Sequence, residues 1–485
     1  MGILLKYQKT IAIHIQYYLC IAILLLFITN IKAQQNWQSL GSDFNRYIWC
    51  FYPDTVENKL YIGGDFSKID STIVYGIAEW DGTNFSPLGC GVDWDCFSPV
   101  CAGCFPRPVY SLTKYKNEIY AGGSFLFVDS ITVNGIAKWN GIKWDSLQKG
   151  VTFNSGSWGK IWFFLVFNDE LYAGGMFEKA GSISARNIAK WDGNNWSNVG
   201  NYNYNGSTIF TMAAYNGKLY AAGIIQDSLN NPINIVCWDG IKWEIVGGGI
   251  KGLQSMIYGM AVYNGELYVG GNFSKADGNT GDFIQKWNGG TWSEVGGGVS
   301  GQYGNNVPVR RFQVFNNELW VIGDFDFAGG IPSRYIAKWN GTDWCSLGSN
   351  FIFPANAITS FRNDLYVGNY FFYIDSVVMP GLIKWTGGNY VDTCGNTSSV
   401  GEKDNEKNAM SVYPNPVTGN EFTVSFPFIK TGTLQVINLL GEALCTYEIR
   451  NTNKISINGA SFKSGCYLLR VKSDSSIFTG KLVKQ

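Results

Sequence analysis

A repeat with a period of about 50 residues runs from about Leu60 to about Tyr390 and limits the folds open to this chain. Its first mark is Leu-Tyr-x-Gly-Gly-x-Phe, its second is Trp-Asp/Asn-Gly, and its third is an aromatic residue that often opens Trp-x-x-Leu/Val-Gly. The second mark begins at Trp80, Trp139, Trp191, Trp238, Trp287, Trp339 and Trp385. Seven copies in one order indicate a solenoid or a propeller, because each unit buries its apolar face against the next.

The local pattern chooses between these two architectures. Each repeat holds four short alternating segments, in one case Met260–Tyr263, Leu267–Phe273, Phe283–Trp287 and Thr291–Val295. Pairs such as Asn264-Gly265 and Asp192-Gly193 tolerate the positive φ angles of hairpin turns, and no stretch shows helical periodicity. Four antiparallel strands per repeat predict an all-β fold, a seven-bladed β-propeller over residues 34–395.

The chain also carries a signal for ring closure. An extra copy of the fourth-strand phrase begins at Trp37, while the last repeat has its weakest fourth strand near Tyr390. We therefore expect the N-terminal strand to join the last blade, which protects the sheet edges. The unit resembles kelch and related propeller repeats in its Gly-Gly phrase and spaced aromatic residues. That resemblance implies the architecture but not a function, since such propellers include binding modules and a copper oxidase.

The N-terminus has the pattern of a signal peptide over residues 1–33. Lys6 and Lys9 precede an apolar run from Leu19 to Ile28, and Ala33 ends the segment with a small residue. A retained membrane anchor is the alternative, because residues 11–31 are about long enough to span a bilayer. Cleavage predicts a protein with no stable membrane span.

Loss of this leader would remove His14, the only histidine of the chain. Its absence excludes Ser-His-Asp and Cys-His nucleophile systems and the usual His-ligated zinc and copper sites. Lys+Arg and Asp+Glu balance at 37 each, which gives no sign of a nucleic-acid partner. We predict that the chain is not an enzyme and holds no metal or cofactor. The alternative is a histidine-free polysaccharide-degrading enzyme with paired carboxylates, for which Asp93 and Asp95 are the candidates.

The repeated aromatic residues and acids are predicted to be structural. Trp and Tyr recur at strand positions, where each buried side chain contributes roughly 1.5–3 kcal/mol, although stacking on sugar rings is the alternative. The slot after the second-mark Trp holds Asp81, Asp192, Asp239, Asn140, Asn288 or Asn340. Asparagine can replace a turn residue but not a catalytic carboxylate. Asp65 and Asp324 recur only twice and stay ambiguous.

Ligand contacts are expected on one face of the predicted disc. The tight turns lie on one face, so the long and variable connections lie on the other. The longest connection, Gly89–Pro108, holds four cysteines, which in an exported protein predict two disulfides, with a four-cysteine metal site as the alternative. These are Cys90, Cys96, Cys101 and Cys104; Cys50, Cys237, Cys345 and Cys394 are too scattered to pair. The predicted ligand-binding residues are Asp93, Trp94, Asp95, Phe97, Phe105, Arg107, Trp158 and Tyr303.

The composition changes after Cys394. Residues 396–410 are a predicted linker, and residues 411–485 are a predicted β-sandwich of short alternating strands. The marks of this segment are Tyr413-Pro414-Asn415-Pro416, the strand Gly465-x-Tyr467-Leu-Leu-Arg and a basic end. Together they closely resemble the C-terminal sorting domain, type A-like, of type IX secretion substrates in the Bacteroidota. A fibronectin-like adhesive module is the alternative.

The resemblance implies a partner and a location. The partner is the type IX secretion machinery, and the location is the medium or the outer-membrane cell surface. With the propeller, it predicts an exported binding protein whose ligand is a glycan or a surface protein. A purely structural surface protein is a further alternative.

Overall fold

The computed structural model describes residues 36–485 with internal gaps. The undescribed positions are 94–105, 130, 302–307, 350, 376, 388–389, 391–393, 395–409, 414, 416, 418, 439–442, 464, 474–476 and 485. The predicted signal peptide, residues 1–33, lies outside the described part. Contacts divide the chain into two compact units between Thr397 and Ser398. Among the described residues, no helix has the length and apolar character needed to cross a membrane.

The first unit is all-β, and its described residues form seven four-stranded antiparallel sheets. The first three sheets are β2 (Ile48–Asp54), β3 (Lys59–Gly64), β6 (Ile77–Trp80), β7 (Phe85–Pro87); β9 (Val109–Tyr115), β10 (Glu118–Gly123), β13 (Ile136–Trp139), β14 (Trp144–Ser146); and β16 (Lys160–Phe167), β17 (Glu170–Met176), β20 (Ile188–Trp191), β21 (Trp196–Ser197). The next two are β22 (Asn205–Tyr215), β23 (Lys218–Gln226), β24 (Ile235–Trp238), β25 (Trp243–Ile245); and β26 (Met256–Tyr263), β27 (Glu266–Asn272), β28 (Ile284–Trp287), β29 (Trp292–Glu294). The last two are β31 (Val309–Phe315), β32 (Glu318–Gly323), β35 (Ile336–Trp339), β36 (Trp344–Cys345); and β37 (Ala357–Phe361), β38 (Asp364–Ile374), β39 (Val377–Trp385), β1 (Trp37–Ser39).

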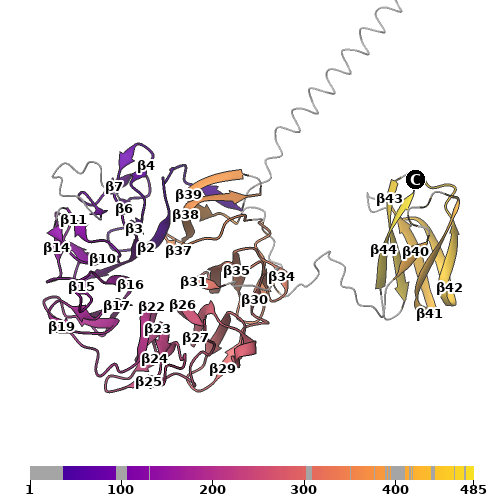
Figure 1. Cartoon of the computed structure of the whole chain (residues 1–485). Coiled ribbons are helices and arrows are strands. Elements are labelled where there is room, and N and C mark those ends of the chain that lie inside the picture. The colour runs from indigo at the N-terminus through magenta and orange to yellow at the C-terminus, as the bar shows by residue number, and fades with distance from the viewer. Residues whose placement is uncertain are drawn as a thin grey trace, which may run out of the picture. The chain divides into compact units, whose positions relative to one another are not determined.

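The seven sheets form a closed ring. The first strand of each sheet contacts the first strand of the next, in the order β2, β9, β16, β22, β26, β31, β37 and back to β2. Figure 1 shows these first strands toward the centre of the ring and the fourth strands, such as β14, β25 and β29, toward its rim. A closed ring of this kind leaves a channel along its axis, lined by the first strands.

Short hairpins extend several connections between the second and third strands. They are β4 (Lys68–Ile69) with β5 (Thr72–Ile73), β11 (Phe127–Val128) with β12 (Ile131–Thr132), β18 (Lys179–Ala180) with β19 (Ile183–Ser184), and β33 (Phe327–Ala328) with β34 (Ile331–Pro332). Three of them gain a strand from the connection that precedes a first strand: β8 (Val92–Asp93), β15 (Val151–Thr152) and β30 (Val299–Ser300). A 3-10 helix, Lys275–Asp277, stands in the equivalent connection of another sheet. The described part of the long connections therefore contains regular structure of its own.

The repeated tryptophans join neighbouring sheets. The indole Nε1 of Trp144 donates to the Leu88 carbonyl at 2.8 Å, and that of Trp243 donates to the Val199 carbonyl at 2.7 Å. Each acceptor belongs to the preceding repeat, and Trp144 is 3% exposed. The prediction that these residues form the core is confirmed for most of them, whereas Trp139, Trp238, Trp292 and Trp385 are partly exposed.

The repeated Asp or Asn positions are turn residues, as predicted. The Asp81 carboxylate accepts hydrogen bonds from the backbone N–H groups of Thr83 and Asn84, both at 2.7 Å. The Asn140 side chain accepts the equivalent bonds from Ile142 and Lys143, both at 3.0 Å. Both side chains close the same turn because each offers an oxygen acceptor.

The N-terminal strand completes the last sheet. Strand β1 pairs antiparallel with β39, so that Trp37 lies opposite Trp385. Trp37 is 1% exposed, and its ring lies 4.9 Å from that of Trp385 and 5.4 Å from that of Phe351. The predicted closure of the ring by this strand is confirmed.

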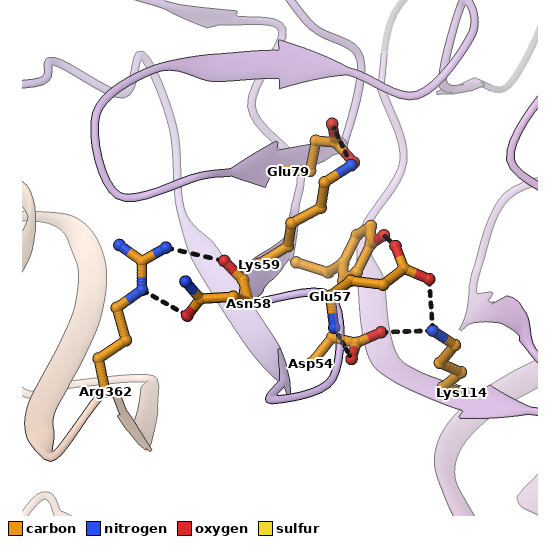
Figure 2. Close-up of polar contacts among 8 residues, drawn as sticks. Asp54, Glu57, Asn58, Lys59, Glu79, Lys114 and Arg362 are labelled. Carbon is orange, nitrogen blue, oxygen red and sulfur yellow. Dashed lines mark hydrogen bonds and ion pairs between the residues drawn. The ribbon is translucent and has the colours of Figure 1, made fainter.

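A polar network also ties the first sheet to its two neighbours, on the face with the tight turns (Figure 2). Arg362, from the last sheet, donates to the side-chain oxygen of Asn58 at 2.7 Å and to its carbonyl at 2.8 Å. Lys114, from the second sheet, donates to the carboxylates of Asp54 at 2.7 Å and Glu57 at 2.6 Å. The hairpin between β2 and β3 is thereby held from both sides.

One disulfide joins cysteines that the sequence left unpaired. Cys345 of β36 bonds to Cys394, across a sequence separation of 49 residues. This bond ties the chain that follows the last sheet to the sheet before it. Cys50, Cys237 and Cys445 are free.

The second unit is a five-stranded sheet around its own apolar core. Its strands are β40 (Ser411–Tyr413), β41 (Glu421–Ile437), β42 (Ala443–Asn458), β43 (Gly465–Ser473) and β44 (Ile477–Lys484). The long strand β41 pairs with β40, β42 and β43. Phe422, Leu434 and Leu469 are among the buried residues of its core.

Candidate ligand site at the centre of the ring

Six of the seven first strands contain a β-bulge near the end at which they enter the ring. A bulge leaves one residue without a partner on the next strand and re-aims its side chain. The unpaired residues are Trp49, Tyr110, Trp162, Phe210, Tyr258 and Arg310. The seventh sheet has Asn356 at the corresponding place, directly before β37.

All seven of these side chains line one cavity of about 380 Å³. Pro308 and Arg311 also contribute to its wall. Because the residues come from consecutive first strands, the cavity lies at one end of the central channel. It opens on the face of the long connections, where sequence analysis expects ligand contacts.

The aromatic residues form a continuous arc, which we call the aromatic mouth: Trp49, Tyr110, Trp162, Phe210 and Tyr258. The rings of Tyr110 and Trp162 stack with centroids 4.0 Å apart. Phe210 lies 5.3 Å from Trp162 and 5.4 Å from Tyr258, and Trp49 lies 6.1 Å from Tyr110. All five are partly exposed, whereas most of the repeated tryptophans between the sheets are buried.

The remaining part of the wall is polar and braced by the second strands. The guanidinium of Arg310 forms a two-pronged ion pair with Asp324, with Nε–Oδ1 at 3.0 Å and Nη2–Oδ2 at 2.7 Å. The Nδ2 of Asn356 donates to Asn369 at 3.0 Å. These bonds hold the side chains of Arg310 and Asn356 in place, and the aromatic mouth forms the other part of the cavity wall.

The two ambiguous acids have different surroundings. Asp324 is paired with Arg310, as described. Asp65 is 9% exposed and accepts a hydrogen bond from the backbone of Tyr47 at 3.0 Å, with Arg46 at 3.9 Å. Burial raises the pKa of the Asp65 carboxyl, although the charge of Arg46 opposes this shift.

A second, smaller cavity of about 190 Å³ continues from the mouth into the channel. It shares Trp49, Tyr110 and Arg311 with the first. At the next position along the seven first strands, five residues are small, namely Cys50, Ser111, Thr211, Gly259 and Ala357, and the other two are Phe163 and Arg311. The channel therefore has an aromatic entrance, a narrow interior and one long cationic side chain between them.

Only part of the sequence-predicted site can be placed. Arg107 is exposed two residues before β9. Burial raises the pKa of Tyr110, and the charge of Arg107 opposes this shift. Trp158, two residues before β16, forms a β-bridge with Thr152. Asp93 ends β8, but its side chain is not described. Trp94, Asp95, Phe97, Phe105 and Tyr303 lie outside the described residues.

The predicted stapled loop is described at one cysteine. Cys90 is disulfide-bonded, whereas Cys96, Cys101 and Cys104 lie outside the described residues, so the pairing stays a prediction. In the described part of the chain, Glu318, Cys345 and Cys394 place potential metal-ligating atoms within 4.8 Å of one another. The two sulfurs are bonded to each other, so they offer no thiolate for a metal.

Sequence analysis missed the aromatic mouth. The signal is present as Ile or Val followed by an aromatic residue at the start of the first strand. The pairs are Ile48-Trp49, Val109-Tyr110, Ile161-Trp162, Ile209-Phe210 and Ile257-Tyr258. Each pair is typical of an ordinary strand, and only the bulge in the pairing of the first and second strands shows that the aromatic side chain lines the cavity.

The sorting motif is partly described in the second unit. Tyr413 is 81% exposed, and the side chain of Asn415 accepts a hydrogen bond from the backbone of Val483 at 2.9 Å. The hydroxyl of Tyr467 donates to the Lys463 carbonyl at 2.6 Å, and Gly465 begins β43. Pro414 and Pro416 lie outside the described residues.

Comparison with known families identifies the tail. Residues 411–485 match the family model of the secretion system C-terminal sorting domain, which confirms the resemblance to type IX substrates. This tail indicates secretion or cell-surface attachment, and it implies interaction with the type IX machinery. The chain is thus an exported all-β ring protein. No curated protein sequence matches it.

Solved structures similar to this chain include propeller proteins of different kinds. A GH74 enzyme from Niastella koreensis is 14% identical, with 92% of this chain and 80% of that chain covered and a TM-score of 0.35. The β-propeller domain of Cps50 (Swd1) from Myceliophteria thermophila is 10% identical, with 72% and 99% covered and a TM-score of 0.32. An α-L-arabinofuranosidase (CtGH43) from Clostridium thermocellum is 13% identical, with 45% and 86% covered and a TM-score of 0.23.

The prediction that the chain is not an enzyme is contradicted by these similarities, because two of the three structures are glycoside hydrolases. The prediction was based on the absence of histidine, which excludes only histidine-dependent catalysis. Glycoside hydrolysis needs two carboxyl groups and no histidine. The missing histidine therefore never excluded this class of reaction.

Proposed function

We propose that this chain is an exported seven-bladed β-propeller that binds a glycan or a surface protein in its aromatic mouth. In this proposal residues 1–33 are a signal peptide, 34–395 the kelch-like propeller, 396–410 a linker and 411–485 a β-sandwich that addresses the chain to the type IX pathway. The seven four-stranded sheets in closed order support the blade count. The sorting tail supports export.

One observation carries the binding proposal. Five consecutive sheets present an aromatic side chain at the same bulged position, all toward one cavity. Packing between sheets does not require these side chains, because a separate set of buried tryptophans performs it. A concave apolar site with a few fixed polar groups is typical of ligand binding. Keeping five aromatic rings partly exposed forgoes burial energy, which a ligand recovers when it covers them.

The test is a binding measurement on the purified full-length protein. We expect selective binding on an array of oligosaccharides and purified cell-surface proteins. Trp162→Ala should then reduce the affinity for the best ligand by about 10- to 100-fold. Stacking of the ligand on one aromatic ring, together with the apolar area that it buries, contributes about 1–3 kcal/mol of binding energy. The affinity is measured by calorimetry, and the unfolding midpoint is measured alongside it.

Ile241→Ala is the matched control. Ile241 is 86% exposed on a tight turn, away from the face that carries the mouth. This variant also removes an exposed apolar side chain, so it should bind like the wild type. Unchanged binding by both Trp162→Ala and Tyr110→Ala would place the ligand elsewhere and contradict the proposed site.

A further inference from the structure

The floor of the aromatic mouth holds an unusual side chain. Arg311 follows the bulged Arg310 in β31 and lines both the mouth and the smaller cavity behind it. The equivalent residues of the other sheets are mostly small, as with Cys50, Ser111 and Gly259. The long side chain of Arg311 therefore occupies the part of the channel that its neighbours leave open.

The two adjacent arginines differ in their partners. Arg310 is neutralised by its two-pronged ion pair with Asp324. Among the described residues, the guanidinium of Arg311 has no hydrogen-bond acceptor and no carboxylate partner. Arg311 lines the channel together with Ser111, whose hydroxyl oxygen accepts a hydrogen bond from the backbone of Phe164 at 3.0 Å.

The charges around Arg311 leave it uncompensated. Its electrostatic neighbours are Cys50 of the first sheet and Arg310. Burial raises the pKa of the Cys50 thiol to about 12, so this thiol is neutral at physiological pH and supplies no counter-charge. Burial also lowers the pKa of Arg311, but arginine stays charged in proteins because its intrinsic pKa is so high.

Arg311 is partly buried, and a cation that gives up part of its hydration without gaining a counter-charge is destabilised. Five other sheets have a small residue at this position and the third has Phe163, so the ring itself does not need an arginine here. A loss of folding stability at one position is typical of a residue that serves ligand binding.

We propose that the aromatic mouth binds acidic sugars, and that Arg311 receives the carboxylate of a uronic acid residue. This inference rests on the proposed function and names its ligand class. The planar fork of the guanidinium matches a carboxylate with two parallel hydrogen bonds, which gives both energy and orientation. The aromatic arc then receives the sugar ring, whose C–H face lies on the electron-rich faces of the aromatic rings.

The dimensions of the site favour a sugar residue over a folded protein. A cavity of about 380 Å³ is at the small end of the range of ligand pockets, which run from about 300 to 1,000 Å³. The carboxylate group must pass the aromatic rings to reach Arg311, so it has to project from a slim end of the ligand. A uronic acid residue at the end or edge of a glycan chain has this form.

The experiment compares each acidic oligosaccharide with its methyl ester on the full-length protein. The probes are short oligomers of galacturonate, glucuronate and mannuronate, and esterification removes the charge while the sugar ring stays. We expect one acid series to bind at least about 10-fold more tightly than its ester, because a charge-assisted hydrogen bond contributes about 1.5–3 kcal/mol. Arg311→Met should reduce binding of the acid about 10- to 100-fold and leave binding of the ester unchanged.

The stability of the variant separates a ligand role from a structural one. Because Arg311→Met removes a partly buried charge that has no carboxylate partner among the described residues, we expect the unfolding temperature to stay the same or rise. A structural role would lower it. Arg311→Lys keeps the charge without the fork and should retain intermediate affinity. Arg334→Met is the control, since Arg334 is partly exposed beside Asp326 at 3.4 Å, outside the mouth.

Each other outcome overturns the inference. Equal binding of acid and ester that still depends on Trp162 would leave the proposed function intact and remove the acidic ligand. Acid binding that Arg311→Met does not change would place the carboxylate elsewhere. Absence of binding for every uronate would reject the acidic sugar, and the array with Trp162→Ala would then decide separately on the mouth.

Discussion

Replacing Trp37 with alanine should lower the free energy of unfolding of the ring by about 3–5 kcal/mol, the range for deletion of a large buried aromatic side chain. Trp37 is 1% exposed and packs against Trp385 and Phe351. It also belongs to the three-residue strand β1, which completes the last sheet far from its neighbours in sequence. Loss of its packing therefore weakens closure of the whole ring as well as one local contact.

Substitution by phenylalanine gives a matched test of this account. The Nε1 of Trp37 has no hydrogen-bond partner among the described residues, whereas the Nε1 of Trp243 donates to the Val199 carbonyl at 2.7 Å. Trp37→Phe should thus cost less than Trp243→Phe, which also leaves a buried carbonyl unpaired at a cost of about 1–3 kcal/mol. Urea unfolding followed by tryptophan fluorescence and circular dichroism measures both. A neutral Trp37→Ala would show that β1 does not hold the ring closed.

The fold could be predicted from the sequence because the same pattern recurs in every repeat. The tight-turn pairs, the repeated tryptophans and the extra phrase at Trp37 each predict a local structural feature from the sequence alone. The same logic extends to a pair of charges that the sequence analysis overlooked. Lys138 pairs with Glu118 at 2.9 Å in the second sheet, and the first sheet has the same pair reversed, as Lys59 with Glu79 at 2.9 Å. Such an exchange indicates contact between the two positions.

The candidate site was less accessible because it depends on a break in the regular pattern. Strict alternation assigns Trp162 and Phe163 to opposite faces of a strand, but the bulge shifts the register between Ile161 and Phe163. Trp162 consequently lines the channel mouth instead of the space between sheets. A bulge is set by the pairing of two strands in space, so one strand's sequence does not reveal it.

The disulfide was inaccessible for a related reason. Cys345 lies in the sixth sheet and Cys394 lies after the last strand of the seventh, yet the two are bonded. The spacing of two distant cysteines in the sequence does not predict that they pair. Long-range pairing of this kind requires the geometry of the closed ring, whereas the repeat alone fixes only the local strands.

The second large effect is expected at Lys114, where Lys114→Met should cost about 3–5 kcal/mol at neutral pH. Its Nζ lies 2.7 Å from a carboxylate oxygen of Asp54, whose side chain is 2% exposed (Figure 2). Without Lys114, this buried carboxylate loses its counter-charge and retains only the backbone N–H groups of Val56 and Glu57, both at 3.0 Å. Lys59→Met is the control, because the partly exposed pair of Lys59 and Glu79 should contribute about 1 kcal/mol or less.

The pH dependence identifies Asp54 as the cause. Burial by itself would raise the pKa of Asp54, but the hydrogen bonds from Lys114 and the backbone outweigh it and hold the pKa below 3.8 in the folded protein. The unfolded chain therefore takes up this proton first, so the stabilisation is fully present above pH 3.8 and is lost as the pH falls through the lower, folded-state value. The difference in stability between the wild type and Lys114→Met should shrink over that pH interval. Adding Asp54→Asn to Lys114→Met should recover stability at neutral pH, because the amide oxygen still accepts the backbone hydrogen bonds and carries no charge. Urea unfolding at neutral and acidic pH measures both effects. A pH-independent difference between wild type and variant, or a double variant no more stable than Lys114→Met, would assign the loss to side-chain packing of Lys114 instead of to its charge.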